Sequence, residues 1–452
     1  MTNLPENWIK CALGDIIRIR NGYAFPKNVF INKENAGETA VPLIKQTQLS
    51  GYTIDLSDCV YVDNKYLREK EEFIVSYGDI LIGLSGSIMK WCVYDKHLPA
   101  LQNQRTGCIK KSNKDKNVKY ILFYLRHISN DIIKQSQGMG ILNISTSTIE
   151  KNTFPLPPLA EQGRIVAKIE ELFAGIDAGI ENLKAVKNQI ALYRQSVLKS
   201  AFDFDASTFS ALKNLIDKVR YGTSKKCSTE ENVNSMPVYR IPNIDFKKGV
   251  LDKTDLKFAS FDDSEKSSLM LKSGDILIIR SNGSLNLVGR AALVYNTDTN
   301  GLYAGYLMRL RIKDTEKLLP KFLLHFLNSG KARAYIEEKA KSTSGVNNIN
   351  SEEISDLQIP VPTLAEQEKI VAEIESRFER ADALETAVDR ALNDAEKLKQ
   401  AVLKKAFSGE LVPQNPDDEP ASVLLDRIRA ARASELPAKK GKRKKTEVDS
   451  QL

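Results

Sequence analysis

The same helix opening occurs twice in this chain, and the repeat limits the folds available to it. The two segments are PLPPLAEQGRIVAKIEELF at residues 155–173 and IPVPTLAEQEKIVAEIESRF at residues 359–378. Aligned from Leu159 on Leu364, ten of the first fifteen positions are identical, at an offset of 205 residues. Prolines precede both segments, where they are tolerated because they lie just outside a helix rather than within it. Both segments are therefore expected to begin helices.

Each repeat continues as a long amphipathic pattern. Apolar residues recur every three or four positions from Ile165 to Ala201 and again from Ile370 to Ala406, which is the spacing of one stripe along an α-helix. Each helix should contain about 42 residues and extend about 63 Å. Such a narrow stripe is poorly buried alone, so the two helices are expected to pair antiparallel as a coiled coil.

The segments between the helices repeat more faintly. YGDILIGLSGSI at residues 77–88 parallels SGDILIIRSNGS at 273–284, and Gly-Asp-Ile-Leu predicts a turn that enters a buried strand. Short β-rich runs, with helices near residues 120–128 and 321–328, indicate a mixed α/β domain in each half. The predicted fold class is α+β: two mixed α/β domains separated by two long antiparallel coiled-coil helices, with pseudo-two-fold symmetry.

The repeat also sets the expected boundaries. These are a first domain at residues 1–155, a central long helix at 156–204, a second domain at 205–360, a C-terminal long helix at 361–410, and a tail at 411–452 that is basic and disordered at its end.

Charge differs between the domains and the helices. Residues 1–150 contain 19 basic and 15 acidic side chains, and residues 206–358 contain 23 and 18, whereas the segments 159–205 and 363–410 are mildly acidic. Basic domains fit nucleic-acid binding, although ordinary solubility charge produces the same pattern. The five scattered cysteines indicate buried, reduced thiols in a cytoplasmic protein, and no apolar run is long enough to suggest a membrane partner. The three histidines are too far apart in the sequence to predict a metal site.

The doubled P-x-P-x-L-A-E-Q-x-[RK]-I-V-A-x-I-E opening, the VLK-[SK]-AF endings, the GDIL elements and FSGELVPQNPDDEPASVLLDRIRAARA at residues 407–433 resemble the specificity subunit of type I restriction–modification enzymes. The resemblance covers the chain up to about Arg432 and implies two target-recognition domains. Each would read one half of a bipartite, asymmetric site in double-stranded DNA, while the paired helices set the gap and dock two methyltransferase (modification) subunits. Restriction/translocase subunits would complete the assembly. The KKGKRKK segment at 439–445 lies outside the resemblance and is expected to be a solvated end.

Catalytic motifs are missing from the sequence. The Pro157-Pro158 pair is not followed by the aromatic residue of an amino-methyltransferase motif, and no phosphate-binding P-loop is present. We therefore expect a non-catalytic chain that binds no metal or cofactor itself, with S-adenosylmethionine, ATP and Mg²⁺ held by partner subunits.

Candidate DNA-binding residues follow the repeated landmarks, where Arg, Lys, Asn and Gln could read base edges and Ser-rich loops could approach phosphates. In the first domain they are Lys45, Gln46, Gln48, Ser85, Ser87, Lys90, Asn103, Gln104 and Arg105. In the second domain they are Arg240, Asn243, Arg280, Asn282, Ser284, Asn286, Ser344, Asn347 and Asn348. Arg280 and Lys45 are the strongest candidates because each follows an apolar, strand-like run. A turn-capping role stays open for each single residue.

Two other functions remain open from the residues alone. The chain could be a coiled-coil scaffold whose two modules bind protein or carbohydrate rather than DNA. It could also be a self-sufficient DNA-modifying enzyme, which the missing motifs disfavour.

Overall fold

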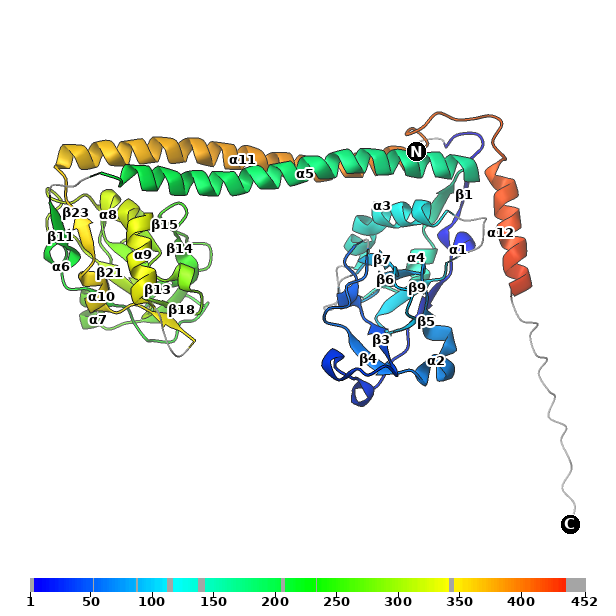
Figure 1. Ribbon diagram of the computed structural model, residues 1–452, viewed down its shortest axis with the longest axis horizontal. Helices are drawn as coiled ribbons and strands as arrows, with labels where there is room; N and C mark the ends of the chain where they lie inside the picture. The colour runs from blue at the N-terminus through cyan, green and yellow to red at the C-terminus, as the bar shows by residue number, and fades with distance from the viewer. Residues whose placement is uncertain are drawn as a thin grey trace, which may run out of the picture. The chain divides into compact units, whose positions relative to one another are not determined.

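The computed structural model describes residues 4–51, 53–86, 88–111, 117–136, 143–204, 208–232, 234–340 and 345–435. The chain forms two compact units, residues 1–180 with 393–452 and residues 181–392. Each unit contains one globular domain and a part of each long helix (Figure 1).

The long helices are α5 (Leu159–Ala201) and α11 (Leu364–Ser408), and within each unit they pack antiparallel. In the first unit, Lys399 Nζ on α11 lies 2.5 Å from Asp177 Oδ1 on α5. In the second unit, Lys187 Nζ lies 2.6 Å from Asp389 Oδ1, and Arg194 Nη2 lies 2.6 Å from Asp382 Oδ1. The prediction of two paired helices is confirmed.

The predicted apolar stripes are only partly buried. Ile190, Ala381 and Val388 form a small core between the helices of the second unit, but Tyr193 and Leu384, both on the predicted stripes, are 44% and 49% exposed. Two paired helices bury only a narrow seam, so apolar residues at its flanks stay in solvent.

The first domain is built on two small sheets and a helix layer. One sheet has the strand order β2-β9-β6-β7 and the other β4-β3-β8-β5, and strands β1 and β10 form an antiparallel ribbon. The strands are β1 (Ile9–Ala12), β2 (Ile19–Asn21), β3 (Ala40–Ile44), β4 (Val60–Asp63), β5 (Ile74–Val75), β6 (Ile80–Gly83), β7 (Trp91–Val93), β8 (Ala100–Gln102), β9 (Thr106–Ile109) and β10 (Thr153–Leu156). The helices are α1 (Leu13–Ile16), α2 (Tyr66–Glu69), α3 (Val118–Ser136) and α4 (Thr146–Glu150).

The second domain repeats this plan. Its sheets have the orders β12-β21-β17-β19 and β16-β13-β20, with β11 and β23 as the ribbon and two smaller ladders, β14–β15 and β18–β22. The strands are β11 (Phe209–Ala211), β12 (Arg220–Tyr221), β13 (Ser235–Tyr239), β14 (Ile244–Asp245), β15 (Val250–Leu251), β16 (Lys257–Ser260), β17 (Ile276–Ile279), β18 (Ser281–Asn282), β19 (Ala291–Leu293), β20 (Leu302–Tyr303), β21 (Leu307–Leu310), β22 (Asn347–Asn348) and β23 (Gln358–Pro360). The helices are α6 (Leu212–Leu215), α7 (Asp263–Leu269), α8 (Pro320–Leu327), α9 (Gly330–Lys339) and α10 (Ser351–Ser355).

The repeated Gly-Asp-Ile-Leu element is the predicted turn into a buried strand. Gly78 and Gly274 have φ angles of 89° and 87°, in the left-handed region that favours glycine. The following carboxylates, Asp79 and Asp275, are buried and accept backbone N–H groups inside the turn. Each also binds a cation, Lys110 Nζ at 2.7 Å from Asp79 and Arg311 Nη2 at 2.6 Å from Asp275, because a buried carboxylate requires a charge partner.

The repeated Ala-Glu-Gln segment fixes the start of each long helix. Gln162 is buried, and its amide donates to the Pro157 carbonyl at 3.0 Å. Gln367 is fully buried, and its amide donates to the carbonyls of Lys317 and Pro362. A single glutamine at each helix start therefore satisfies carbonyls of the preceding proline-rich segment, which explains why the motif occurs twice.

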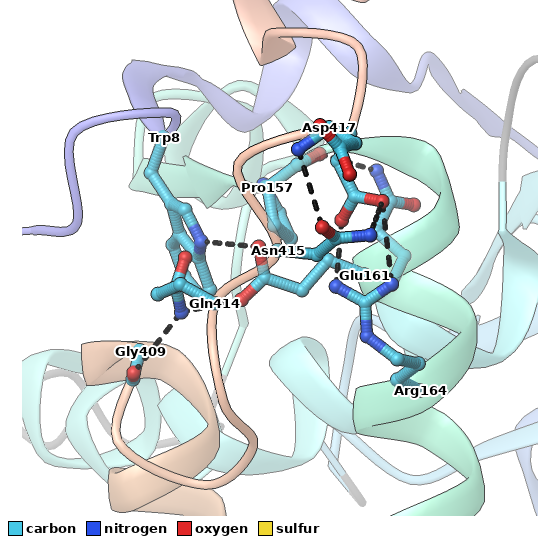
Figure 2. A network of polar contacts seen from close by, with 10 residues as sticks. Trp8, Pro157, Glu161, Arg164, Gly409, Gln414, Asn415 and Asp417 are labelled. Carbon is cyan, nitrogen blue, oxygen red and sulfur yellow. Dashed lines mark hydrogen bonds and ion pairs between the residues drawn. The ribbon is translucent and has the colours of Figure 1, made fainter.

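The glutamates of the repeated motif differ in their surroundings. Glu366 is hydrogen-bonded to Thr363 at the exposed start of α11, whereas Glu161 is 1% exposed. Trp8 Nε1 donates to Glu161 at 3.0 Å, and Gln414 Nε2 donates at 2.7 Å from the segment that follows α11 (Figure 2). Burial raises the pKa of Glu161, although both hydrogen bonds oppose the shift. The segment after α11 therefore covers the start of α5.

The segment that follows α11 contains a further helix. Residues 421–435 form helix α12 (Ala421–Glu435), which contacts α1. Ala421, Leu424, Leu425 and Ile428 of α12 belong to the core of the first domain, and Arg432 Nη1 donates to the Asp15 carbonyl at 2.8 Å. The apolar spacing of three and four residues in this helix is the signal that the predicted boundary at 411 overlooked. The KKGKRKK segment lies outside the described residues.

We predict that Leu425→Ala destabilises the first domain. Leu425 is 2% exposed, and truncating a buried leucine lowers the free energy of unfolding by about 2–5 kcal/mol. Val423→Ala is the matched control, because Val423 lies on the same helix and is 45% exposed. Hydrogen exchange should accelerate in first-domain peptides for Leu425→Ala and stay unchanged in second-domain peptides. Equal effects of the two substitutions would contradict the packing of α12.

Four of the five cysteines are buried. Cys11, Cys59, Cys92 and Cys108 are buried free thiols, as predicted, whereas Cys227 is half-buried. Burial raises the pKa of Cys108 to about 12, which makes its thiol unreactive.

None of the described helices has the length and hydrophobicity needed to cross a membrane, and the described residues contain no cluster of three metal-binding side chains.

Candidate DNA interface

The same turn follows strand β3 in the first domain and its equivalent, β13, in the second. The backbone N–H of Lys45 donates to Gln48 Oε1 at 3.0 Å, and that of Arg240 donates to Asn243 Oδ1 at 2.9 Å. Gln48 is 4% exposed and Asn243 is 1% exposed. These two candidates are almost fully buried and hold the turn from inside. Their buried amides instead position Lys45 and Arg240 at the same place in each domain.

A second matched position follows strands β6 and β17. The backbone N–H of Leu84 donates to the Arg105 carbonyl at 3.0 Å, and that of Arg280 donates to the Tyr306 carbonyl at 2.9 Å. Leu84 and Arg280 therefore occupy equivalent positions in the two domains, and so do Arg105 and Tyr306. The scaffold is repeated at the level of single hydrogen bonds, while the side chains that it carries are unrelated.

In the second domain, these positions line a cleft of about 720 Å³. The guanidinium carbon of Arg280 lies 4.4 Å from the centre of the Tyr221 ring, and Nε of Arg280 is buried without a hydrogen-bond partner. Tyr306, in the turn that precedes β21, is 64% exposed. The cleft therefore combines an oriented guanidinium with an exposed aromatic ring.

Salt bridges distinguish Arg280 from the other cations of the cleft. Arg240 and Lys257 both bind Asp255, at 2.8 and 3.3 Å, and Lys225 binds Glu265 at 2.5 Å. No described carboxylate lies within salt-bridge distance of Arg280. Its charge is therefore available to an incoming acceptor.

A ladder of asparagines borders the same cleft. Ser281 pairs with Asn348 and Asn282 with Asn347 across strands β18 and β22, and the N–H of Ile349 donates to the Arg280 carbonyl at 2.9 Å. Asn282, Asn347 and Asn348 are thus brought next to Arg280.

Two further second-domain candidates lie beyond this ladder. Ser284 and Asn286 are exposed in the loop that follows β18, and the Asn286 carbonyl accepts hydrogen bonds from Arg290 and Arg333. Ser344 lies outside the described residues.

The first domain brings a different set together. Lys45 Nζ lies 4.4 Å from the centre of the Phe30 ring, and burial lowers the pKa of its ammonium group. Gln46 carries a buried Oε1 atom without a hydrogen-bond partner, and its side chain lies beside Gly86 in the loop that contains Ser85. Gln104 and Arg105 are exposed on the neighbouring strand end.

The remaining first-domain candidates are placed less favourably. Lys90 is exposed beyond the loop, at the end that enters β7. Asn103 is 9% exposed, and its carbonyl accepts from Thr106. Ser87 lies outside the described residues.

Each domain therefore carries one cluster of candidate DNA-binding residues. The first-domain loop cluster is Lys45, Gln46, Ser85, Gln104 and Arg105. The second-domain loop cluster is Arg240, Arg280, Asn282, Asn347, Asn348, Tyr221 and Tyr306.

Sequence reasoning missed both tyrosines of the second cluster, but a signal for one exists. Arg-x-Gly occurs at residues 20–22 and 220–222. A Cβ at Gly22 would lie 2.1 Å from the Asn103 carbonyl oxygen, and one at Gly222 would lie 2.2 Å from the Tyr303 carbonyl oxygen. The glycine is therefore required by a close backbone approach. This approach fixes the position of the preceding residue, which is Asn21 in the first domain and Tyr221 in the second. Tyr306 follows a short Ala-Gly pair and has no comparable motif.

Comparison with known proteins decides the family. The family model for the type I restriction modification DNA specificity domain matches residues 5–190 and 206–393. The chain belongs to this family. The two matches coincide with the two repeats, so the type I DNA specificity domain is present twice, and the function of the chain is DNA sequence recognition in a type I restriction–modification system. The scaffold for protein or carbohydrate is not supported.

Individual relatives agree with this assignment along the whole chain. The type I restriction enzyme EcoKI specificity subunit of Escherichia coli K12 is 30% identical, over 98% of this chain and 99% of the relative. The StySPI specificity subunit of Salmonella potsdam is 28% identical, over 95% and 96%. A solved chain from a study of complex assembly and conformational transition in the type I system aligns with a TM-score of 0.66 at 19% identity, over 90% of this chain and 99% of that chain. This last likeness concerns the fold alone.

Proposed function

We propose that each domain of this specificity subunit reads one half of a bipartite, asymmetric DNA site through its own loop cluster. The observation that carries this proposal is a repeated backbone whose side chains differ at several equivalent positions, such as Leu84 and Arg280. Lys45 and Arg240 occupy equivalent turns, as do Arg105 and Tyr306. Base identity is read by the donors and acceptors of side chains, so the two clusters would select different sequences.

Arg280 is proposed as the central base-reading residue of the second cluster. A guanidinium is suited to the O6 and N7 acceptors of guanine, which it binds with two hydrogen bonds. Stacking on Tyr221 orients the group, and the lack of a carboxylate partner leaves its donors available. The exposed amide of Asn348 supplies the donor and acceptor pair that suits adenine, whereas Asn282 Oδ1 accepts from the Ser284 N–H and Asn347 Nδ2 donates to the Gly283 carbonyl.

The paired helices are proposed to set the gap between the half-sites and to dock two methyltransferase subunits. The ion pairs of Lys187 with Asp389 and Arg194 with Asp382 fix an antiparallel register that places Leu192 level with Leu384. Leu192 is 68% exposed and Leu384 is 49% exposed. Exposed leucines on a helix pair fit an apolar contact with helices of another subunit.

We predict that Leu192→Glu and Leu384→Glu weaken association with the methyltransferase subunits by at least about tenfold each, because a charge would be desolvated in an apolar contact. Lys184→Glu is the control, since it places a glutamate on the same helix at a polar, exposed position. Equilibrium binding of the purified subunits provides the measurement. If all three variants bound the methyltransferase subunits with the same affinity, the helices would not be the docking surface.

Chemistry is proposed to belong to the partners. In this account the chain is a non-catalytic subunit, two methyltransferase subunits bring S-adenosylmethionine, and restriction/translocase subunits bring ATP and Mg²⁺. Native mass spectrometry of the co-purified assembly measures the stoichiometry. Methyl transfer by the isolated chain would contradict the non-catalytic assignment.

A further inference from the structure

A cavity of about 420 Å³ lies in the second unit, lined by α5, α8, the segment 246–249 and Phe378 of α11. Its volume is within the range of about 300–1,000 Å³ that is common for sites of small molecules. It is separate from the second-domain loop cluster, since no residue lines both. Phe246 and Phe378 supply aromatic surface.

An unsatisfied polar group faces this cavity. Asn328 is 8% exposed, and its Nδ2 donates to the Leu324 carbonyl at 3.1 Å, but its buried Oδ1 has no hydrogen-bond partner among the described residues. A buried acceptor of this kind is costly unless a donor reaches it. Asn328 therefore requires a ligand or water that donates a hydrogen bond.

His325 adds a second polar group one turn earlier on α8. Burial lowers its pKa to about 4, so the imidazole is neutral at pH 7 and offers one N–H donor and one acceptor nitrogen. Its ring contacts the edge of Phe378, with centroids 5.9 Å apart. Together, His325 and Asn328 present a donor and two acceptors beside an aromatic wall.

The rim of the cavity carries excess positive charge. Lys187 and Arg194 are neutralised by Asp389 and by Asp382 with Glu385. Lys247 and Lys248 are exposed and form no salt bridge with described residues. Arg290 is likewise without a carboxylate partner, and its guanidinium stacks on Phe246 at 4.8 Å. Three cations are thus available to an anion.

The first unit carries a different side chain at the position of Asn328. Tyr124 packs on Phe407 as Phe326 packs on Phe202, which aligns α3 with α8 and places Arg126 at the position of Asn328. The Arg126 guanidinium lies 5.0 Å from the centre of the Phe173 ring, and Phe173 is the repeat equivalent of Phe378. At the position of the unsatisfied Asn328 amide, the first unit therefore carries a guanidinium that stacks on the equivalent phenylalanine.

We propose that this cavity binds a nucleotide, with the base edge at Asn328 and His325 and the phosphates at Lys247, Lys248 and Arg290. An amino-substituted base supplies the donor that Asn328 lacks and an edge that suits a neutral imidazole. Inorganic phosphate alone would place acceptors against the Asn328 oxygen, and an apolar ligand would leave the three cations without a counter-charge. The nucleotide is either free or part of a DNA strand, and both share this chemistry.

Calorimetric titration of the full chain with ATP, AMP, adenosine and inorganic phosphate tests the site. ATP and AMP should bind with one site per chain, and inorganic phosphate should bind at least about tenfold more weakly. Asn328→Leu should weaken AMP about tenfold by removing the acceptor. Asn328→Arg, which introduces the first unit's residue, should abolish binding by occupying the cavity. Absence of ATP and AMP binding to the unaltered chain would overturn the proposal.

A surface variant keeps the test valid if the Asn328 variants fold poorly. Lys247→Ala with Lys248→Ala alters two exposed side chains and should weaken ATP at least about tenfold while changing adenosine less than twofold. Lys272→Ala with Lys313→Ala is the control, and unchanged ATP affinity in the rim variant would overturn the proposal. Random-sequence double-stranded DNA distinguishes the sources. Competition with ATP supports a nucleotide of a DNA strand, and simultaneous binding supports a free nucleotide.

Discussion

Arg280→Ala is expected to weaken binding of the cognate site by about 1–3 kcal/mol and to relax selection in one half of that site only. The value is that of a bidentate contact between a guanidinium and guanine. Arg280 forms no salt bridge with any residue that the structure describes and is oriented by Tyr221, so its removal takes away a base contact without freeing a described carboxylate. Competition binding against sites mutated in each half gives the measurement.

Two variants separate base reading from simple charge. Arg280→Lys keeps the positive charge but loses the planar fork, so it should lose selectivity nearly as fully as alanine. Lys225→Ala is the matched control in the same cleft, because its charge is already neutralised by Glu265, and it should leave the preferred sequence unchanged. An equal loss of affinity for sites altered in either half would count against assigning Arg280 to one half-site.

Lengthening both helices is expected to lengthen the gap between the half-sites. Seven residues inserted after Ile180 and seven after Glu396 preserve the phase of the apolar seam. They add about 10.5 Å to the helix pair, which corresponds to about three base-pair steps of DNA. Affinity for the original site should fall at least about hundredfold, because only one half can be engaged, and a site with three added base pairs should recover it.

Insertion into α5 alone serves as the control for this experiment. It shifts the register of Lys187 with Asp389 and of Arg194 with Asp382, so it should weaken binding to every spacing. If the double insertion left the preferred gap unchanged, the helices would not set the spacing.

Much of the architecture followed from residue patterns. The two apolar stripes predicted the paired helices, and Gly-Asp-Ile-Leu predicted the turns at Gly78 and Gly274, because each feature depends on local geometry. The same reasoning named no helix at residues 421–435, although apolar residues recur there every three or four positions. It also assigned Gln48 and Asn243 to DNA, although the same amide chemistry serves to close a turn from inside.

The interface was less predictable than the fold. Tyr221 on β12 and Tyr306 in the turn before β21 are distant from each other in sequence, so no local pattern connects them with Arg280. Arg280 differs from its neighbours because Arg240 and Lys225 are paired with Asp255 and Glu265. The spacing of these residues in the sequence does not predict the salt bridges. The unsatisfied Oδ1 of Asn328 and the equivalence of Asn328 with Arg126 both follow from tertiary packing, so the sequence alone predicted neither.

Selection of bound sequences from a random DNA library, followed by sequencing, tests most directly whether two unlike domains read two unlike half-sites. For the unaltered subunit in its assembly, two specified blocks of different sequence should emerge, separated by a fixed number of unspecified base pairs. For the assembly with Arg280→Ala, one block should become degenerate while the other and the gap persist. A single continuous block, or two blocks that degrade together, would contradict the account.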